Sequence, residues 1–155
     1  MVTRAFLILV LSMAIAAPAF AAGSSSTSTP PNSRDTFDDG VKAVKRGDFD
    51  KAAGLFEKVV RRQSDNADAW NFLGFSRRNL GQYDDSFAAY QKALAIDPDH
   101  RGANEYLGEL YLKLDQPDKA KERLSRLADI CGVDCEEYDD LKMAIEAFEA
   151  KKQGS

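Results

Sequence analysis

One histidine and several paired carboxylates are the residues best suited to acid–base chemistry. His100 lies in the turn Pro98-Asp99-His100, whereas a catalytic histidine needs a nucleophile or an orienting acid within reach. The sequence contains no Gly-x-Ser-x-Gly, phosphate-binding loop or His-Glu-x-x-His pattern. Carboxylate pairs such as Asp84-Asp85 fall at expected helix starts, where the helix dipole favours negative charge. We therefore interpret His100 as a surface turn residue and expect a non-enzyme without metal or cofactor.

The first 21 residues have the composition of a cleaved export signal. Arg4 precedes an apolar run over 6–17, Pro18 breaks the run, and Ala19-Phe20-Ala21 has the small-x-small form of a cleavage site. The alternative is a retained membrane anchor, because residues 5–22 carry no charge and about 18 apolar residues are the lower limit for crossing a bilayer. We predict cleavage, which leaves a periplasmic or secreted chain that does not insert into a membrane.

The segment that follows the signal is expected to be a disordered linker. Residues 22–32 are mostly Gly, Ser, Thr and Pro, and such a segment has too little apolar surface to offset the entropy of ordering it.

Cys131 and Cys135 are the only cysteines. In an exported protein an even pair of cysteines is expected to be joined. A redox pair usually has Cys-x-x-Cys spacing in a thioredoxin-like context, and a zinc site would need two further ligands. We predict a structural disulfide that holds the last helix to the preceding ones.

The charge of the chain argues against nucleic acid as a partner. The formal net charge is −4, and contacts with phosphates require clustered Lys and Arg. Basic residues here occur singly or in pairs such as Arg61-Arg62. We expect a protein or a peptide as the partner instead.

A shift of 34 residues superposes the chain on itself. Small residues recur where two helices must touch, and large apolar residues recur where a core must be filled. The aligned columns are Gly40/Gly74/Gly108, Leu73/Leu107, Phe49/Tyr83, Ala52/Ser86/Ala120, Phe56/Tyr90/Leu124 and Val59/Ala93/Leu127. Because these columns share one period, we divide the chain into repeats at 33–66, 67–100 and 101–134.

Each repeat is expected to hold two helices, separated by breaks such as Gly47, Gly81 and Asp97-Pro98. The predicted helices are 37–46, 50–62, 67–80, 84–96, 103–114 and 118–130.

A seventh helix, within a segment at 135–151, is predicted to cap the stack and to leave a tail at 152–155. It has Tyr138, Leu141, Ile145 and Phe148 on one face. The alternative for this amphipathic helix is binding to a partner.

The middle repeat resembles a tetratricopeptide repeat (TPR). It carries Trp70-x-x-Leu73-Gly74, Gly81-x-Tyr83, Ser86-x-x-x-Tyr90 and Asp97-Pro98, against the family pattern W-x-x-L-G-x-x-Y, A-x-x-x-F, P. Arg77 stands in the Tyr slot of the pattern and Ser86 in its Ala slot. The resemblance implies an all-α fold, a right-handed superhelical stack of three TPR helix hairpins with a C-terminal capping helix.

The resemblance also implies a concave groove lined by the first helix of each pair. The proposed groove residues are Phe37, Val41, Asn71, Phe75, Arg78, Glu105 and Glu109. Phe37, Val41 and Phe75 have the alternative interpretation of core residues. Asn71 is suited to hydrogen-bond an extended peptide, and Arg78 is suited to pair with an acidic group.

We therefore expect an exported scaffold that binds a protein or peptide in this groove during assembly of an envelope complex. The alternative is an accessory subunit that is permanently docked on such a complex, with no ligand in the groove.

Overall fold

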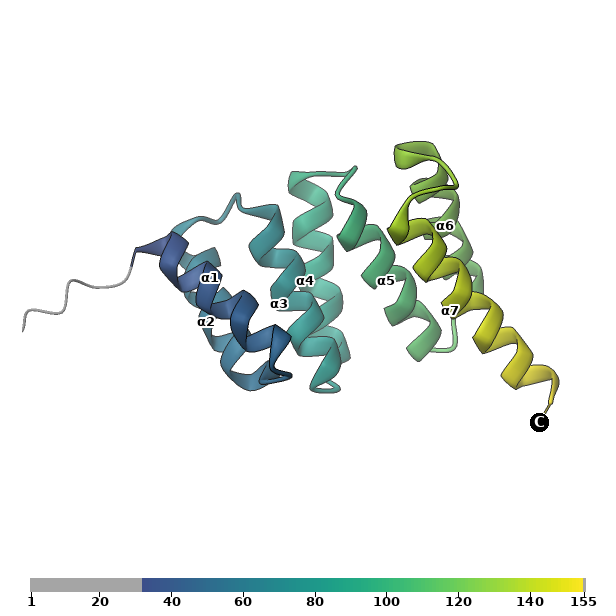
Figure 1. Cartoon of the computed structure of the whole chain (residues 1–155), viewed down its shortest axis with the longest axis horizontal. Coiled ribbons are helices and arrows are strands. Elements are labelled where there is room, and N and C mark those ends of the chain that lie inside the picture. The colour runs from purple at the N-terminus through teal and green to yellow at the C-terminus, as the bar shows by residue number, and fades with distance from the viewer. Residues whose placement is uncertain (1–31, 155) are drawn as a thin grey trace, which may run out of the picture.

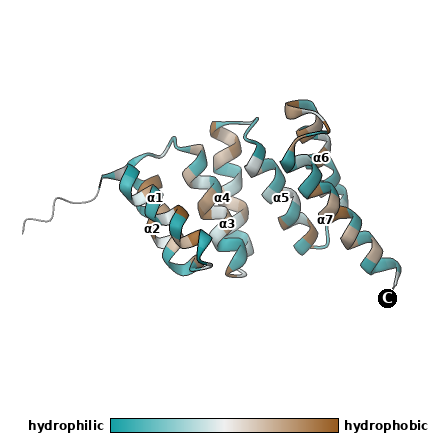
Figure 2. Ribbon diagram, viewed as in Figure 1, coloured by the Kyte–Doolittle hydropathy of each residue, from teal (hydrophilic) through white to brown (hydrophobic). Residues whose placement is uncertain are grey.

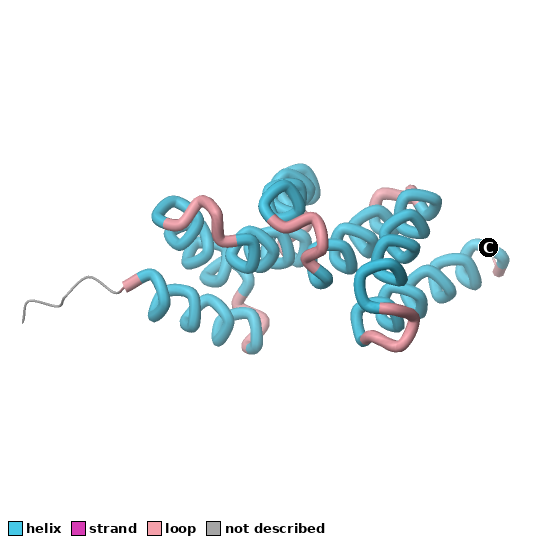
Figure 3. The backbone as a smooth tube through the Cα atoms, turned by 90° about the horizontal axis from the view of Figure 1, so that it is seen from above, coloured by secondary structure: helices cyan, strands magenta, loops and turns pink. Residues whose placement is uncertain are grey.

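The computed structural model describes residues 32–154, which form seven helices and no strand (Figure 1). The helices are α1 (Ser33–Lys45), α2 (Phe49–Arg62), α3 (Ala67–Asn79), α4 (Tyr83–Ile96), α5 (Arg101–Lys113), α6 (Pro117–Cys131) and α7 (Glu136–Gln153). Short loops join them throughout (Figure 3). The predicted signal peptide at 1–21, and the linker up to residue 31, lie outside the described residues.

Polar caps set the starts of several helices. Asn32 Oδ1 accepts a hydrogen bond from Asp35 N at 2.9 Å, so α1 begins four residues before the predicted start at 37. His100 does the same for α5, because its Nδ1 accepts from Ala103 N at 3.1 Å. His100 Nε2 also faces Asp68 Oδ1 at 3.1 Å, which ties the starts of α3 and α5 together. His100 is therefore a capping and bridging residue rather than only a turn residue.

The helices pack as hairpins that stand side by side along the long axis of the molecule (Figure 1). A glycine on the first helix lets the second helix approach closely. A Cβ added at Gly40 would come within 2.7 Å of the Phe56 ring, and one at Gly74 within 2.6 Å of the Tyr90 ring. The glycine and aromatic columns of the sequence thus meet face to face in the first two repeats.

The third repeat departs from this pairing. The 34-residue period aligns Leu124 with Phe56 and Tyr90, but the nearest side chain to Gly108 is Leu141 of α7, 2.5 Å from an added Cβ. A leucine is shorter than an aromatic residue, so α7 supplies the residue that covers the glycine. This helix packs on both α5 and α6, and its Leu141 and Ile145 are buried.

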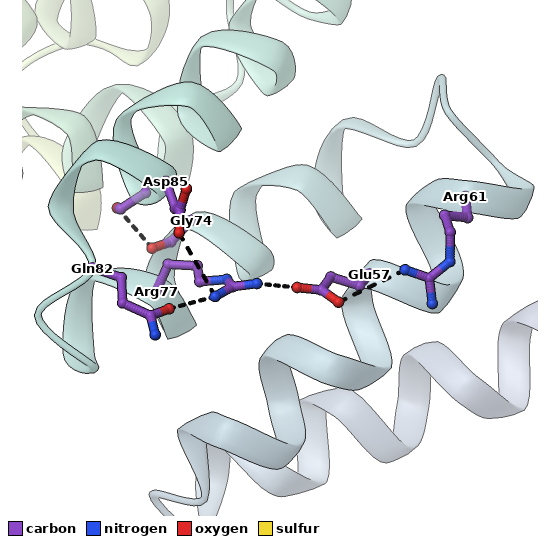
Figure 4. A network of polar contacts seen from close by, with 7 residues as sticks. Glu57, Arg61, Gly74, Arg77, Gln82 and Asp85 are labelled. Carbon is purple, nitrogen blue, oxygen red and sulfur yellow. Dashed lines mark hydrogen bonds and ion pairs between the residues drawn. The ribbon is translucent and has the colours of Figure 1, made fainter.

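Arg77, which occupies the tyrosine slot of the repeat pattern, joins the first two repeats through polar contacts (Figure 4). Its guanidinium pairs with Glu57 of α2, donates to Gln82 Oε1 at 2.5 Å, and lies 3.8 Å from Asp85 Oδ2. A cation thus replaces an aromatic contact between α2, α3 and α4.

Hydrophobic positions alternate with polar ones along helices such as α1 and α7 (Figure 2). The buried positions form three hydrophobic clusters along the stack. Across residues 32–154, no helix combines the length and the apolar character that crossing a membrane would require.

Candidate partner-binding groove

The structure brings together five of the seven proposed groove residues, on the facing sides of α3 and α5. Between these helices, Arg78 pairs with Glu109, and the rings of Phe75 and Tyr106 lie 4.9 Å apart. Asn71 faces the start of α5, where a Cβ at Gly102 would come 3.1 Å from its Nδ2 atom. Glu105 lies on the same helix and interacts electrostatically with both Glu109 and Arg78.

The other two proposed groove residues, Phe37 and Val41, have the contacts of core residues. Both are partly buried against the first hydrophobic cluster. The Phe37 ring lies 5.5 Å from that of Phe56 and 5.7 Å from that of Phe72, edge-on in both cases. The first repeat therefore uses these positions to close the core, which is the alternative interpretation that the sequence left open.

Arg78 is engaged within the chain, where the acidic group that it pairs with is Glu109. Besides its ion pair with Glu109, its guanidinium carbon lies 5.4 Å from the ring centroids of Phe75 and Tyr106, within the range of cation–π attraction. The Arg78 side chain is 10% exposed, and its Nε atom is buried without a hydrogen-bond partner. These contacts of Arg78 link α3 to α5.

A cavity of about 620 Å³ lies where α3, α5 and α7 meet, and we call it the inner groove. Its lining residues are Arg78, Glu109, Leu112, Lys113, Ala144, Phe148, Lys151 and Lys152. Half of this wall comes from α7, which the sequence analysis treats mainly as a cap. The available signal was Phe148, the last residue of the apolar face of α7, which is only partly buried against the core.

A group of acidic side chains adjoins the inner groove. Four carboxylates, which we call the acidic cluster, interact here: Glu105, Glu109, Glu137 and Asp140. Glu105 is only 6% exposed. Burial, followed by the neighbouring negative charges of Glu109, Asp140 and Glu137, raises the pKa of Glu105 to about 8.

Two acceptors, one of them in the acidic cluster, are buried without a hydrogen-bond partner. Asn71 Oδ1 is one, on a residue that is 5% exposed. Glu137 Oε2 is the other, and Arg101 Nη1 approaches it to 3.5 Å as an ion pair without a hydrogen bond. Because buried polar atoms are almost always paired in native proteins, these two acceptors are exceptions in the fold.

Cys131 and Cys135 lie at the junction of α6 and α7, with their Sγ atoms at the disulfide distance of 2.08 Å. Cys135 is also the residue that precedes α7. In the part of the chain that the structure describes, these two sulfurs and Glu137 are the one group of three possible metal ligands within 4.8 Å of one another. Metals bind thiolates, so the joined sulfurs are not available to a metal.

Comparisons with known proteins agree on the fold. Two family models described as tetratricopeptide repeat match residues 38–101 and 77–145. Tetratricopeptide repeat protein 37 of Xenopus laevis is 36% identical over 76 residues, which are 49% of this chain and 5% of that protein. Protein FlbA of Caulobacter vibrioides is 32% identical over 97 residues, 59% of this chain and 16% of that protein. The chain thus spans a small part of these relatives.

Among solved structures, the type III secretion translocator chaperone SycD of Yersinia enterocolitica has the same architecture. It superposes with a TM-score of 0.69 at 16% identity, covering 80% of this chain and 96% of that one. The structure of SycD in complex with a peptide of the translocator YopD superposes with a TM-score of 0.66 at 17% identity, covering 77% and 93% of the two chains. At these identities the likeness shows the fold alone.

Proposed function

The chain belongs to the tetratricopeptide repeat family, and on that premise we propose that it is a non-catalytic scaffold that holds a protein or peptide partner in the inner groove. The observation that carries the proposal is the inner groove itself, a cavity of about 620 Å³ whose walls on α3, α5 and α7 combine apolar and charged side chains. A peptide offers apolar side chains, charges and backbone hydrogen-bonding groups to such a surface.

The make-up of the inner groove supports a peptide rather than a small apolar ligand. Leu112, Ala144 and Phe148 provide an apolar strip, whereas Glu109 and Lys113 provide opposite charges on one wall. Such a mixed surface is typical of protein interfaces, which combine an apolar centre with a polar rim. The peptide seated on SycD gives a precedent for ligand binding by this architecture.

We further propose that the chain works outside the cytoplasm, in assembling an envelope complex. The support is the order of a basic residue, an apolar run and a small-x-small site within residues 1–21, together with a cysteine pair at disulfide distance. Mass spectrometry of the chain isolated from its native cells tests this proposal. The expected N-terminus is Ala22, and an intact Met1 on a membrane-bound chain would contradict it.

The binding proposal is tested by filling the inner groove. Ala144 lines the groove, whereas Ala147 is exposed elsewhere on the same helix, so Ala144→Arg and Ala147→Arg form a matched pair. Crosslinking in the native compartment, followed by pull-down, should show capture lowered about tenfold or more by Ala144→Arg, equivalent to 1.4 kcal/mol. Capture by Ala147→Arg should be unchanged, and circular dichroism should show equal helicity for both.

The two outcomes of the pull-down separate the scaffold from its alternative. Transient capture that a peptide competitor reverses supports the scaffold. A partner held at constant stoichiometry, and equally by both variants, would support a permanently docked accessory subunit whose contact lies outside the inner groove.

A further inference from the structure

We propose that the acidic cluster is a subsite for one cationic side chain, a lysine or an arginine, of the bound partner. This inference rests on the proposed function and specifies the chemistry of the partner. It is carried by geometric features: the Glu105 side chain is only 6% exposed, and Asn71, whose Oδ1 atom is buried without a hydrogen-bond partner, faces the start of the same helix.

The acceptors come from different helices, and each lacks a hydrogen-bond donor. Asn71 of α3 presents its unpaired Oδ1 atom, and Glu137 of α7 presents its unpaired Oε2 atom. Glu105 of α5 is buried, and within residues 32–154 no ion pair or hydrogen bond satisfies its carboxyl group. A carboxylate or an amide oxygen in such a place is satisfied by N–H donors.

The charges around Glu105 favour a cation. Glu109 on the same helix, and Glu137 and Asp140 on α7, all act against its ionisation. Arg78 of α3 is the facing cation that acts in favour of ionisation, and it is already engaged by Glu109. Arg101 pairs with Glu137 on the other side of the cluster, which leaves two cations for four carboxyl groups, and such a buried group is stabilised by a further positive charge.

The spacing of the acidic cluster favours an organic cation over a metal ion. In the described part of the chain, the carboxylates of this cluster do not come within 4.8 Å of one another as a group of three. Hard metal ions gather oxygen ligands at about 2.0–2.6 Å. An ammonium or guanidinium group is larger and carries several N–H donors, so it can reach acceptors that stand further apart.

The acidic cluster adjoins the inner groove and its apolar strip. Glu109 belongs to both the acidic cluster and the inner groove, and Leu112 follows it one turn later on α5. The partner segment is therefore expected to place a basic residue beside apolar residues, with the apolar part along Leu112 and Phe148.

Selection from a random 12-residue peptide library tests the inference without knowledge of the natural partner. The mature chain should enrich peptides that combine a Lys or Arg with apolar neighbours. Glu105→Gln keeps the shape of the side chain but cannot ionise beside a bound cation, so it should bind a selected peptide about tenfold or more weakly. Glu146→Gln makes the same change at an exposed position of α7, and it should bind as the parent chain does.

The outcomes separate this inference from the proposed function. Enriched peptides without a basic residue, or equal affinity of the parent chain and Glu105→Gln, would overturn the cationic subsite while groove binding stands. If no peptide is enriched and Ala144→Arg also leaves native capture unchanged, both the subsite and the scaffold proposal fail.

Discussion

The two ends of the inner face differ in what the same repeat positions do. Phe37, Asn71 and Glu105 are related by the 34-residue period. Phe37 packs edge-on against aromatic rings and closes the core of the first repeat. Asn71 and Glu105 are buried at least as deeply, but they bring polar groups, and Asn71 Oδ1 has no hydrogen-bond partner. One backbone position therefore stabilises the stack at the N-terminal end and binds a ligand, in our proposal, at the C-terminal end.

This difference teaches that the repeat fixes where a side chain points, and that the residue type decides its use. In the N-terminal region, α1 to α3, mutations are predicted to change mainly the free energy of unfolding. In the C-terminal region, α3, α5 and α7, mutations are predicted to change partner binding and the pH dependence of the free energy of unfolding. The predictions below test that division.

The largest expected effect is on the aromatic core of the N-terminal region. Phe56 is fully buried, and its ring fills the space above Gly40 and stacks on Phe72 with centroids 5.2 Å apart. Phe56→Ala should lower the free energy of unfolding by about 3–5 kcal/mol, as measured by urea denaturation. A loss below about 1 kcal/mol would mean that the N-terminal region is not held by this cluster.

The C-terminal region should show a pH dependence that originates at Glu105. Its pKa in the folded chain is about 8, raised from an ordinary value of 4.5. Between these values the folded chain holds a proton that the unfolded chain has lost, so stability is present at low pH and falls as the pH rises. The maximal slope for one group is about 1.4 kcal/mol per pH unit, and it should flatten above pH 8.

Urea denaturation between pH 5 and 9 measures this slope, and Glu105→Gln should remove most of it. Glu122→Gln, at an exposed position of α6, is the matched control and should retain the slope. If the free energy of unfolding of Glu105→Gln depends on pH as that of the parent chain does, another residue is the titrating group, and the contrast between the two regions is weakened.

A smaller effect is expected from the cysteine pair, and it should be confined to the C-terminal region. A disulfide that closes a short loop contributes about 2 kcal/mol by loop entropy. Cys131→Ser with Cys135→Ser should lower stability by about that amount and speed amide exchange in α7, without changing exchange in α1 and α2. Purified native chain should contain no titratable thiol under denaturing, non-reducing conditions, and two free thiols would contradict the disulfide.

How much of this molecule the sequence predicts depends on whether a contact follows the repeat. The helices and the pairing of Gly40 with Phe56 and of Gly74 with Tyr90 were predictable, because small and large residues recur at one period. The contact of Gly108 with Leu141 was not, because it breaks that period.

The candidate site was predictable in its positions but not in its pairings. The sequence placed Asn71, Arg78 and Glu109 on one face, because the first helices of the repeats share an orientation. It did not predict that Arg78 bonds to Glu109, because that pairing depends on the rotation between neighbouring repeats. The share of the wall that α7 contributes was missed for the same reason, since no later repeat fixes how this helix docks.

The smallest expected effect compares two buried asparagines that differ in their hydrogen bonds. Asn104 Nδ2 donates to Pro98 O at 3.2 Å and to His100 O at 3.1 Å, and its Oδ1 accepts from Arg123 at 3.3 Å. Asn71 Oδ1 has no partner. Asn104→Leu should therefore cost about 1–3 kcal/mol, because it leaves buried partners unsatisfied, whereas Asn71→Leu should be neutral or stabilising by up to about 1 kcal/mol.

The comparison of these two variants becomes decisive when partner capture is measured beside stability. An asparagine that is kept for binding should lose capture on replacement by leucine without losing stability. An asparagine that is kept for the fold should lose stability first. If Asn71→Leu destabilises the chain as much as Asn104→Leu does, Asn71 has partners within the fold, and the division between a structural end and a binding end of the inner face is wrong.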